Sequence, residues 1–207
     1  MTATNSVMSL LFSSEERPLG RSWEHWTTRW WQWFLSIPTG DSPVTNNTDN
    51  NSCIGSSDPN VFFLASTIGG RVERTVKIPS GKAVLFPVIN VTISNSEEPA
   101  LNTDSEMISF VKHLMDDIVE KQANIDGEDL LISDTFRVQS PPFNFSYPPE
   151  NIFGAREGQT RGVGDGYWIF MRPMQPGRHA IKTYGACMSG KIQIGAEIEL
   201  IVENNSS

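Results

Sequence analysis

The stretch KIQIGAEIELIVE, residues 191–203, alternates apolar and polar side chains along almost its whole length. Side chains at even positions from Ile192 to Val202 would share one face of a strand, and most charged and amide side chains would share the other. A period of two over this length predicts a β-strand with one face in the core. The protein is therefore expected to contain a sheet that is exposed to water on one side.

Further strands are predicted from shorter apolar or alternating runs. Two pairs of runs flank turns rich in glycine or proline, and each pair is expected to form a hairpin. These pairs are 61–68 with 71–78, and 167–172 with 178–184. The run 83–93 begins with apolar residues at nearly every position, which predicts a strand covered on both faces.

Two amphipathic helices are expected near 22–37 and 104–123. In the first, Trp23, Trp26, Trp30, Trp33, Phe34 and Ile37 recur at steps of three and four residues. Ser22 is placed to cap this helix, and Pro38 to end it. In the second, Thr103 and Glu106 have the spacing of a capping box.

Together these elements predict a mainly β protein with two helices, built as an antiparallel β-sandwich or jelly-roll-like single domain. Many short strands without regular alternation of strand and helix favour this class. The domain is expected to span 22–203, after a flexible N-terminal segment at 1–21. The sequence contains neither an internal repeat nor a stretch that reads as a linker between domains.

Composition argues against several functional classes. The chain has 207 residues and a formal net charge of -8, which disfavours nucleic acid or an anionic membrane surface as the main partner. It contains no apolar run of about 18 residues, the length a transmembrane helix requires. Two cysteines and three histidines are too few for common zinc sites, so neither a metal nor a cofactor is expected.

The two cysteines and a cluster of Asp and Asn residues at 49–51 each allow two interpretations. Cys53 and Cys187 either form a disulfide that closes a long loop or remain two buried thiols. Asp49, Asn50 and Asn51 offer oxygen ligands for calcium, but Ile54 stands where the EF-hand pattern needs glycine.

Trp31 is the tryptophan that departs from the apolar stripe of the first helix. At 100° per residue it lies about 60° beyond the edge of the stripe, beside Leu35 one turn later. An exposed pair of this kind can stack on a sugar ring or dock a partner chain. The alternative is that a loop covers it and that both side chains serve packing.

The glycine-rich segment 151–166 is the second candidate site. Glycines allow a backbone to approach a ligand closely, and two arginines can grip a carboxylate or phosphate. The segment leads into an aromatic and cationic strand, so the predicted ligand-binding set is Trp31, Arg156, Arg161, Asp165, Tyr167, Trp168, Arg172 and His179. The alternative is a surface hairpin loop, because a strand and not a helix follows the glycines, which contradicts a nucleotide fingerprint.

Catalytic patterns are sparse. The sequence has no G-x-S-x-G motif, and only a pairing of Cys187 with His179 resembles a nucleophile and its base. Adjacent carboxylates at 97–98, 116–117 and 128–129 are candidates for a general acid and base, although such pairs usually lie on solvated turns or helices.

Four motifs give the chain a resemblance. They are WTTRWWQW at 26–33, IPSGKA at 78–83 followed by Phe86-Pro87, GYW at 166–168 and PGRHAI at 176–181. With them the chain resembles an uncharacterised family of prokaryotic, often exported, single-domain proteins, over most of its length from Trp23 to Val202. The resemblance implies a single domain and brings no activity with it.

The favoured function is a non-enzymatic binding or interaction protein, whose partner is a small polar ligand or a protein. The alternatives are a hydrolase acting on a polar or carbohydrate substrate, and a structural subunit of an assembly. Several N-x-S/T triplets and the resemblance favour an extracellular or cell-surface location over the cytoplasm, although no standard signal peptide is visible. The sequence does not fix the oligomeric state.

Overall fold

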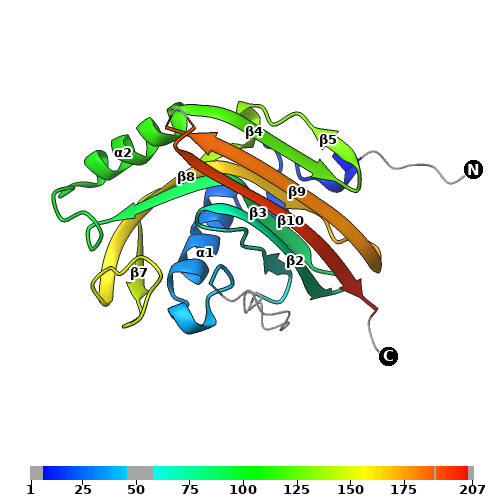
Figure 1. Cartoon of the computed structure of the whole chain (residues 1–207), viewed down its shortest axis with the longest axis horizontal. Helices are drawn as coiled ribbons and strands as arrows, with labels where there is room; N and C mark the ends of the chain where they lie inside the picture. The colour runs from blue at the N-terminus through cyan, green and yellow to red at the C-terminus, as the bar shows by residue number, and fades with distance from the viewer. Residues whose placement is uncertain (1–6, 46–57, 189, 205–207) are drawn as a thin grey trace, which may run out of the picture.

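A computed structural model describes residues 7–45, 58–188 and 190–204. Strands in this part of the chain form two five-stranded sheets (Figure 1). The first sheet contains β1 (Val61–Phe63), β3 (Ala83–Ser94), β8 (Gly158–Met171), β6 (Arg137–Gln139) and β7 (Phe143–Tyr147). The second sheet has the order β2 (Gly70–Pro79), β10 (Ile192–Glu203), β9 (Gly177–Cys187), β4 (Ile118–Ile125) and β5 (Glu128–Leu130).

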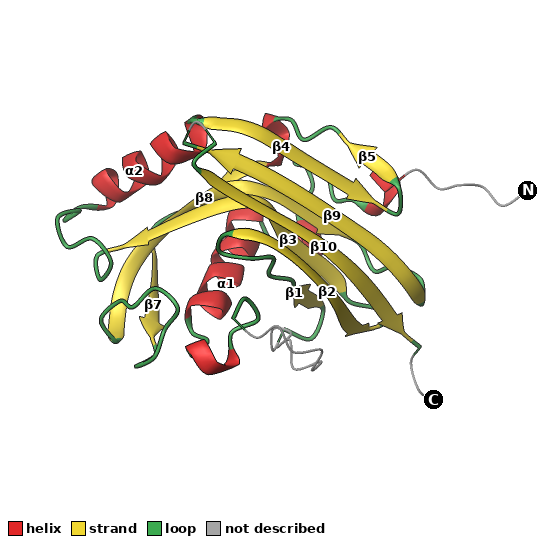
Figure 2. Cartoon of the chain, in the orientation of Figure 1, coloured by secondary structure: helices red, strands yellow, loops and turns green. Residues whose placement is uncertain are grey.

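Helices lie on the first sheet and at one end of the molecule (Figure 2). They are α1 (Trp23–Leu35) and α2 (Asp104–Asp116), with 3₁₀ turns at Val7–Leu10, Pro18–Gly20, Thr39–Asp41 and Asp134–Phe136. One core cluster joins the facing sides of the two sheets, through side chains such as Ile169 and Leu200. A second cluster joins α1 to the other face of the first sheet, where Trp30 packs against Trp168. The order of layers is therefore α1, first sheet, second sheet.

The prediction of a mainly β, sandwich-like single domain with two helices is confirmed. The sheets are mixed, however, and not purely antiparallel. The strand β1 pairs with β3 in parallel, and β2 pairs with β10 in parallel. The alternation in β10 is confirmed, because Ile194, Ala196, Ile198, Leu200 and Val202 are buried while Glu197 and Glu203 are exposed.

Both predicted hairpins are wrong. After β1 the chain leaves the first sheet and enters the second sheet as β2. After β8 it again passes from the first sheet to the second, as β9. Met174, in the connection from β8 to β9, is buried and anchors that crossing in the core between the sheets. A period of two identifies the buried face of a strand but carries no information about its neighbour.

The helices are confirmed at their starts, and the second is shorter than predicted. The Ser22 side chain accepts a hydrogen bond from the His25 N–H, and Thr103 and Glu106 form the capping box. Helix α2 ends at Asp116, because Ile118 begins β4 and pairs with Cys187 of β9. A β-branched residue such as Ile118 is favourable in a strand, and its apolar side chain satisfied the helical period by coincidence.

The N-terminal segment 1–21, expected to be flexible, is packed where the structure describes it. Val7 and Leu11 are buried in the core between the sheets. The Phe12 N–H donates to the Phe170 carbonyl at 2.9 Å, which continues the first sheet beyond β8. This segment therefore belongs to the folded domain from Val7 onward.

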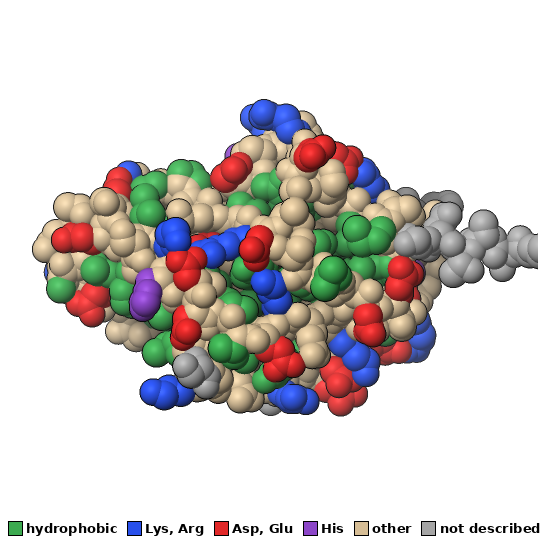
Figure 3. Space-filling view, turned by 90° about the horizontal axis from the view of Figure 1, so that it is seen from above, with side chains coloured by type: hydrophobic (Ala, Val, Ile, Leu, Met, Phe, Trp, Pro, Cys, Tyr) green, Lys and Arg blue, Asp and Glu red, His purple; other side chains and the backbone are tan. Residues whose placement is uncertain are grey.

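Charged side chains of both signs lie interspersed on the face seen in Figure 3. Among the described residues, no helix is both long enough and apolar enough to cross a membrane.

Candidate functional site

A pocket lies beside β3, along the part of this strand that extends beyond its pairing with β1. The strand β1 pairs only with Ala83, Val84 and Leu85, whereas β3 continues to Ser94. The chain after β1 diverges and leaves a pocket of about 190 Å³, which we call the edge pocket. Its lining is Trp30, Trp31, Phe34, Val44, Ala65, Ser66, Thr67, Ile68, Pro87, Ile89, Asn90, Val91, Thr92, Leu114, Met115, Phe153, Cys187, Ile192 and Ile194.

One wall of the edge pocket is aromatic and comes from α1. Trp30 stacks on Phe34 with ring centroids 4.9 Å apart and meets Trp31 edge to face at 5.0 Å. The Trp30 Nε1–H donates to the Leu64 carbonyl at 3.2 Å and so holds α1 to the chain that leaves β1. Helical spacing of three and four residues delivers these rings to one side, which fixes the wall.

Glycines of β8 allow this wall to approach the sheet. A Cβ atom on Gly164 would lie 2.2 Å from Trp31 Nε1, and one on Gly166 would lie 2.5 Å from the Asn90 Cβ. The two glycines are two residues apart and therefore lie on the same face of the strand. Trp31 and Asn90 thus occupy neighbouring positions above β8, where any larger residue would displace them.

Both of these side chains carry a buried N–H group without a partner. Among the described residues, Trp31 Nε1 and Asn90 Nδ2 are buried and make no hydrogen bond. A buried donor left unsatisfied costs about 1–3 kcal/mol. Among the described residues Thr28 Oγ1, Trp33 Nε1 and Trp168 Nε1 are likewise buried without a partner, so these two atoms alone do not mark a site.

The opposite wall is aliphatic and comes from α2 and the second sheet. Leu114, Met115, Ile194 and the Cys187 thiol form it. Burial raises the pKa of Cys187, and the Asp117 carboxylate raises it further, so this thiol stays neutral. The thiol therefore acts as a wall atom and not as an activated nucleophile.

The rim of the edge pocket is apolar and open to water. The exposed fractions of Ile68, Ile192 and Phe153 are 53%, 42% and 37%. Exposed large apolar side chains around an apolar pocket are typical of ligand-binding sites.

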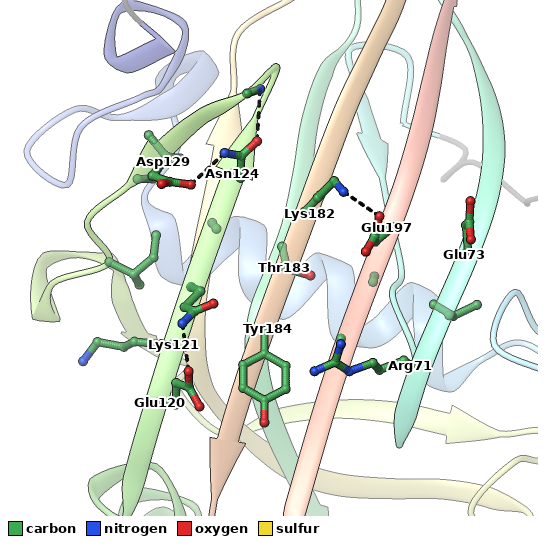
Figure 4. A pocket seen from close by; sticks show the side chains of 18 of the residues that line it. Arg71, Glu73, Glu120, Lys121, Asn124, Asp129, Lys182, Thr183, Tyr184 and Glu197 are labelled. Atoms are coloured by element: carbon green, nitrogen blue, oxygen red, sulfur yellow. Dashed lines mark hydrogen bonds and ion pairs between the residues drawn. The ribbon is translucent and has the colours of Figure 1, made fainter.

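A larger hollow of about 1240 Å³ covers the solvent side of the second sheet. We call this surface the outer face; its outward side chains include Arg71, Glu73, Glu120, Asn124, Lys182, Tyr184 and Glu197 (Figure 4). Gln122 lines it as well. The strand register places Arg71, Gly195 and Tyr184 in one row, and Glu73, Glu197 and Lys182 in the next.

Polar groups of the outer face satisfy one another. Lys182 Nζ lies 2.7 Å from the Glu197 carboxylate, and Asn124 donates to Asp129 at 2.7 Å. The Arg71 guanidinium lies 5.2 Å from the centre of the Tyr184 ring, above the space that Gly195 leaves empty. Paired side chains on a sheet exposed to water are typical of a solvated face, so size alone does not make this hollow the better candidate.

The structure places two of the predicted site residues at the α1 wall. Trp31 is buried, with 4% of its surface exposed, so of the two alternatives the structure supports packing and not an exposed Trp31/Leu35 pair. Helix α1 packs with a wider face than the tryptophan stripe, and Gly164 makes room for the additional ring. Trp168 is completely buried and contacts Trp31 with ring centroids 6.2 Å apart. Trp31 alone of the predicted set lines the edge pocket.

The predicted glycine-rich loop is a strand over most of its length, because the structure extends β8 through it, while anion binding by its residues stays a prediction. Gly162, Gly164 and Gly166 lie within this strand. Arg161 donates to both carboxylate oxygens of Asp104 at 2.6 and 2.7 Å, and Asp165 is buried and bound by Arg137. Arg156 lies exposed before β8. The glycines therefore serve close packing, and two of the charges serve internal ion pairs.

The remaining three predicted residues contact different carboxylates in different places. Tyr167 donates to Asp134 at 2.9 Å, Arg172 lies 2.6 Å from Glu16, and His179 lies 2.8 Å from Asp126. Burial lowers the pKa of His179, but Asp126 and the Gln175 carbonyl outweigh it and raise the pKa. The structure therefore does not gather the predicted set into one site.

The other chemical hypotheses gain no support from the described residues. Cys187 and His179 are eight residues apart on β9, or about 26 Å, so they cannot act as nucleophile and base. The part of the chain that the structure describes holds no group of three or more metal-binding side chains. Cys53 and the acidic cluster at 49–51 lie outside the described residues, so the disulfide and the calcium site stay predictions.

Sequence reasoning missed Asn90 and the aliphatic wall. Asn90 sits in an apolar strand, which is the one available signal, because a polar side chain in such a run calls for a partner. Leu114 and Met115 fall on the apolar face of the second predicted helix, and the sequence gives no indication that they line a pocket.

Comparisons with known proteins add little. No family model matches the chain, and no curated protein matches its sequence. One matching solved structure is described as PbICP-C in complex with falcipain-2. It is 11% identical, covers 70% of this chain and 99% of its own, and has a TM-score of 0.25. At these values the likeness carries no argument about function.

Proposed function

We propose that this protein is a non-enzymatic binding protein that holds a small, largely apolar molecule in the edge pocket. The observation that carries the proposal is an apolar pocket of about 190 Å³ with an aromatic wall from α1 and exposed apolar side chains at its rim. Ligand pockets are typically apolar cavities with a few polar groups that orient the bound molecule.

The pocket volume sets the size of the ligand. A cavity of about 150 Å³ in another protein holds benzene, so about 190 Å³ accommodates one ring with a short substituent. The aromatic wall of Trp30 and Phe34 favours a planar ring, because aromatic pairs gain about 0.5–1.5 kcal/mol beyond the area they bury.

The experiment follows the Cys187 thiol in a Cys53→Ser variant. The rate of alkylation by iodoacetamide is measured with and without toluene, indole or benzamide, together with thermal melting. We expect a bound molecule to slow alkylation and raise the melting temperature, since binding to the native state stabilises it. If none of the three molecules changes either quantity, the proposal is wrong.

A pair of variants on α2 controls for the location of binding. Leu114→Trp fills the pocket and should abolish protection, because Leu114 lines it. Phe110→Trp introduces the same ring on an exposed part of the same helix and should leave protection unchanged, since Phe110 is 39% exposed and lies outside the pocket.

A further inference from the structure

We infer that the occupant of the edge pocket is a short extended segment of a partner protein, which pairs with the open edge of β3 and places apolar side chains against both walls. This inference rests on the proposed function, because it uses the same pocket, and it names the class of partner. Small apolar molecules that fit the pocket then take the place of one side chain of the segment.

The edge pocket lies against the edge of β3 and not against one face of it. The four consecutive residues 89–92 all line the pocket. Ile89 belongs to the core between the two sheets, whereas Asn90 lies on the opposite side, above Gly166. Since successive side chains of a strand point to opposite faces, a pocket that contacts all four residues lies beside the strand backbone.

Pairing between β1 and β3 ends for a local reason. The Ala83 N–H donates to the Asn60 carbonyl at 2.9 Å, and the Leu85 carbonyl accepts from the Leu64 N–H at 3.0 Å. Pro87 comes next in this alternation and has no N–H to continue it. The register of β3 with β8 shifts directly after Pro87, and the chain that follows β1 diverges.

Beyond this shift, backbone groups of Asn90 and Thr92 point to the open edge. Gly164, which lies opposite Thr92 on β8, uses its backbone N–H and C=O to bond Ser140 on its far side. In an antiparallel pair, both residues opposite each other then point away from one another, and Asn90 follows by the period of two. Among the described residues, no backbone hydrogen bond joins Asn90 or Thr92 to a neighbour on that side.

These backbone groups specify a strand as the occupant. An extended peptide supplies N–H and C=O groups in the matching alternation, and its side chains give specificity through pockets beside the edge. Sheet edges that stay single usually carry charged side chains. The edge strand β2 has Arg71, Glu73 and Lys77, whereas β3 contains no Lys, Arg, Asp or Glu.

The two walls specify the side chains of the segment. Because side chains alternate along a strand, one faces Trp30 and Phe34 on the aromatic wall, and the next faces Leu114 and Met115 on the aliphatic wall. An aromatic residue beside an aliphatic one therefore suits the pocket.

The test uses the blocked peptide Ac-Thr-Phe-Val-Thr-NH2 and two copies of it, one N-methylated at Phe and the other at Val. Affinities are measured by calorimetry. Along a paired strand only alternate N–H groups point to the neighbour, so one N-methyl peptide should bind at least roughly 10-fold more weakly than the parent and the other about equally. Equal affinity of the two N-methyl peptides overturns the inference.

Variants of Asn90 test the edge from the side of the protein. Asn90→Pro removes an N–H that β8 does not use, and Asn90→Ala is the matched control that loses the side chain alone. We expect Asn90→Pro to bind the parent peptide at least roughly 10-fold more weakly than Asn90→Ala. Equal affinity in the two folded variants contradicts edge pairing, and the N-methyl peptides decide the matter if Asn90→Pro does not fold.

The remaining outcomes separate the inference from the proposed function. If the peptide does not bind while toluene still protects Cys187 from alkylation, the inference is wrong and the proposed function stands. If neither the peptide nor any small molecule binds, both are wrong. A dimer in sedimentation that Leu114→Trp dissociates would identify a second copy of this chain as the occupant and would also overturn the inference.

Discussion

The edge pocket and the outer face differ in how their polar groups are satisfied. The outer face is the larger hollow, yet its charges lie in pairs such as Lys182 with Glu197. The edge pocket is smaller and apolar, and its two donors at Trp31 and Asn90 have no partner among the described residues. The apolar lining and the exposed apolar rim, more than volume, therefore make the edge pocket the better candidate site.

The same contrast governs stability, since side chains around β8 are buried and those on the outer face are in water. Single substitutions chosen as pairs, one in each region, measure this difference directly.

The largest difference is expected between Asp165→Asn and Glu197→Gln. Asp165 is buried and accepts from Arg137 at 2.7 Å, so neutralising it leaves the guanidinium short of its partner and should cost about 3 kcal/mol. Glu197 is 57% exposed and pairs with Lys182, and its loss should cost less than about 1 kcal/mol. Urea unfolding of both variants checks this, and similar costs would contradict the comparison.

A smaller difference is expected between two glycines in strands. Gly164→Ala brings a Cβ to 2.2 Å from Trp31 Nε1 and should destabilise by roughly 1–3 kcal/mol through overpacking. Gly195→Ala meets Arg71 at 3.3 Å, which the flexible side chain can relieve, so its effect should stay within about 0.5 kcal/mol. Thermal melting distinguishes the two, and an unchanged melting temperature for Gly164→Ala would show that Trp31 does not press on β8.

The smallest effect is a pair of opposite pH dependences. Burial raises the pKa of Glu97 above 4.5, although Ser94 and Tyr147 donate to it at 2.7 and 2.8 Å. Its folded form thus holds the proton more tightly, and its stabilising contribution is lost as pH rises through the raised pKa. The hydrogen bond from Arg178 lowers the pKa of Glu199 on the second sheet, so its contribution is lost as pH falls through the lowered value.

Urea unfolding between pH 3 and 8 checks both signs. The free energy of unfolding of the wild-type protein minus that of Glu97→Gln should fall as pH rises. The corresponding difference from Glu199→Gln should increase as pH rises. The same slope for both comparisons would mean that the two carboxylates share one environment.

Local pattern predicted the elements of this fold better than their partners. The alternation in β10 and the capping signals of both helices were sufficient, because each depends on side chains close in sequence. Both predicted hairpins are wrong, since the chain changes sheets at the turns. The predicted second helix is too long, because Ile118 fits the helical period of 3.6 residues as well as a strand.

Trp31 is the one residue of the edge pocket that the sequence predicted, and the prediction considered an exposed side chain, whereas Trp31 is buried. The angular offset of Trp31 suggested exposure, whereas Gly164 admits the ring to the interior. The spacing of Gly164 and Gly166 does place both on one face of a strand, but the sequence does not show which side chain packs on each glycine.

The sequence by itself determined the class of the fold, the acidic net charge and the aromatic face of α1, because composition and period express local physics. Only the tertiary structure decided that β3 has an open edge and that Asn90, Leu114 and Cys187 meet Trp31 there. Residues so distant along the chain are brought together by strand pairing between sheets, which no local period encodes.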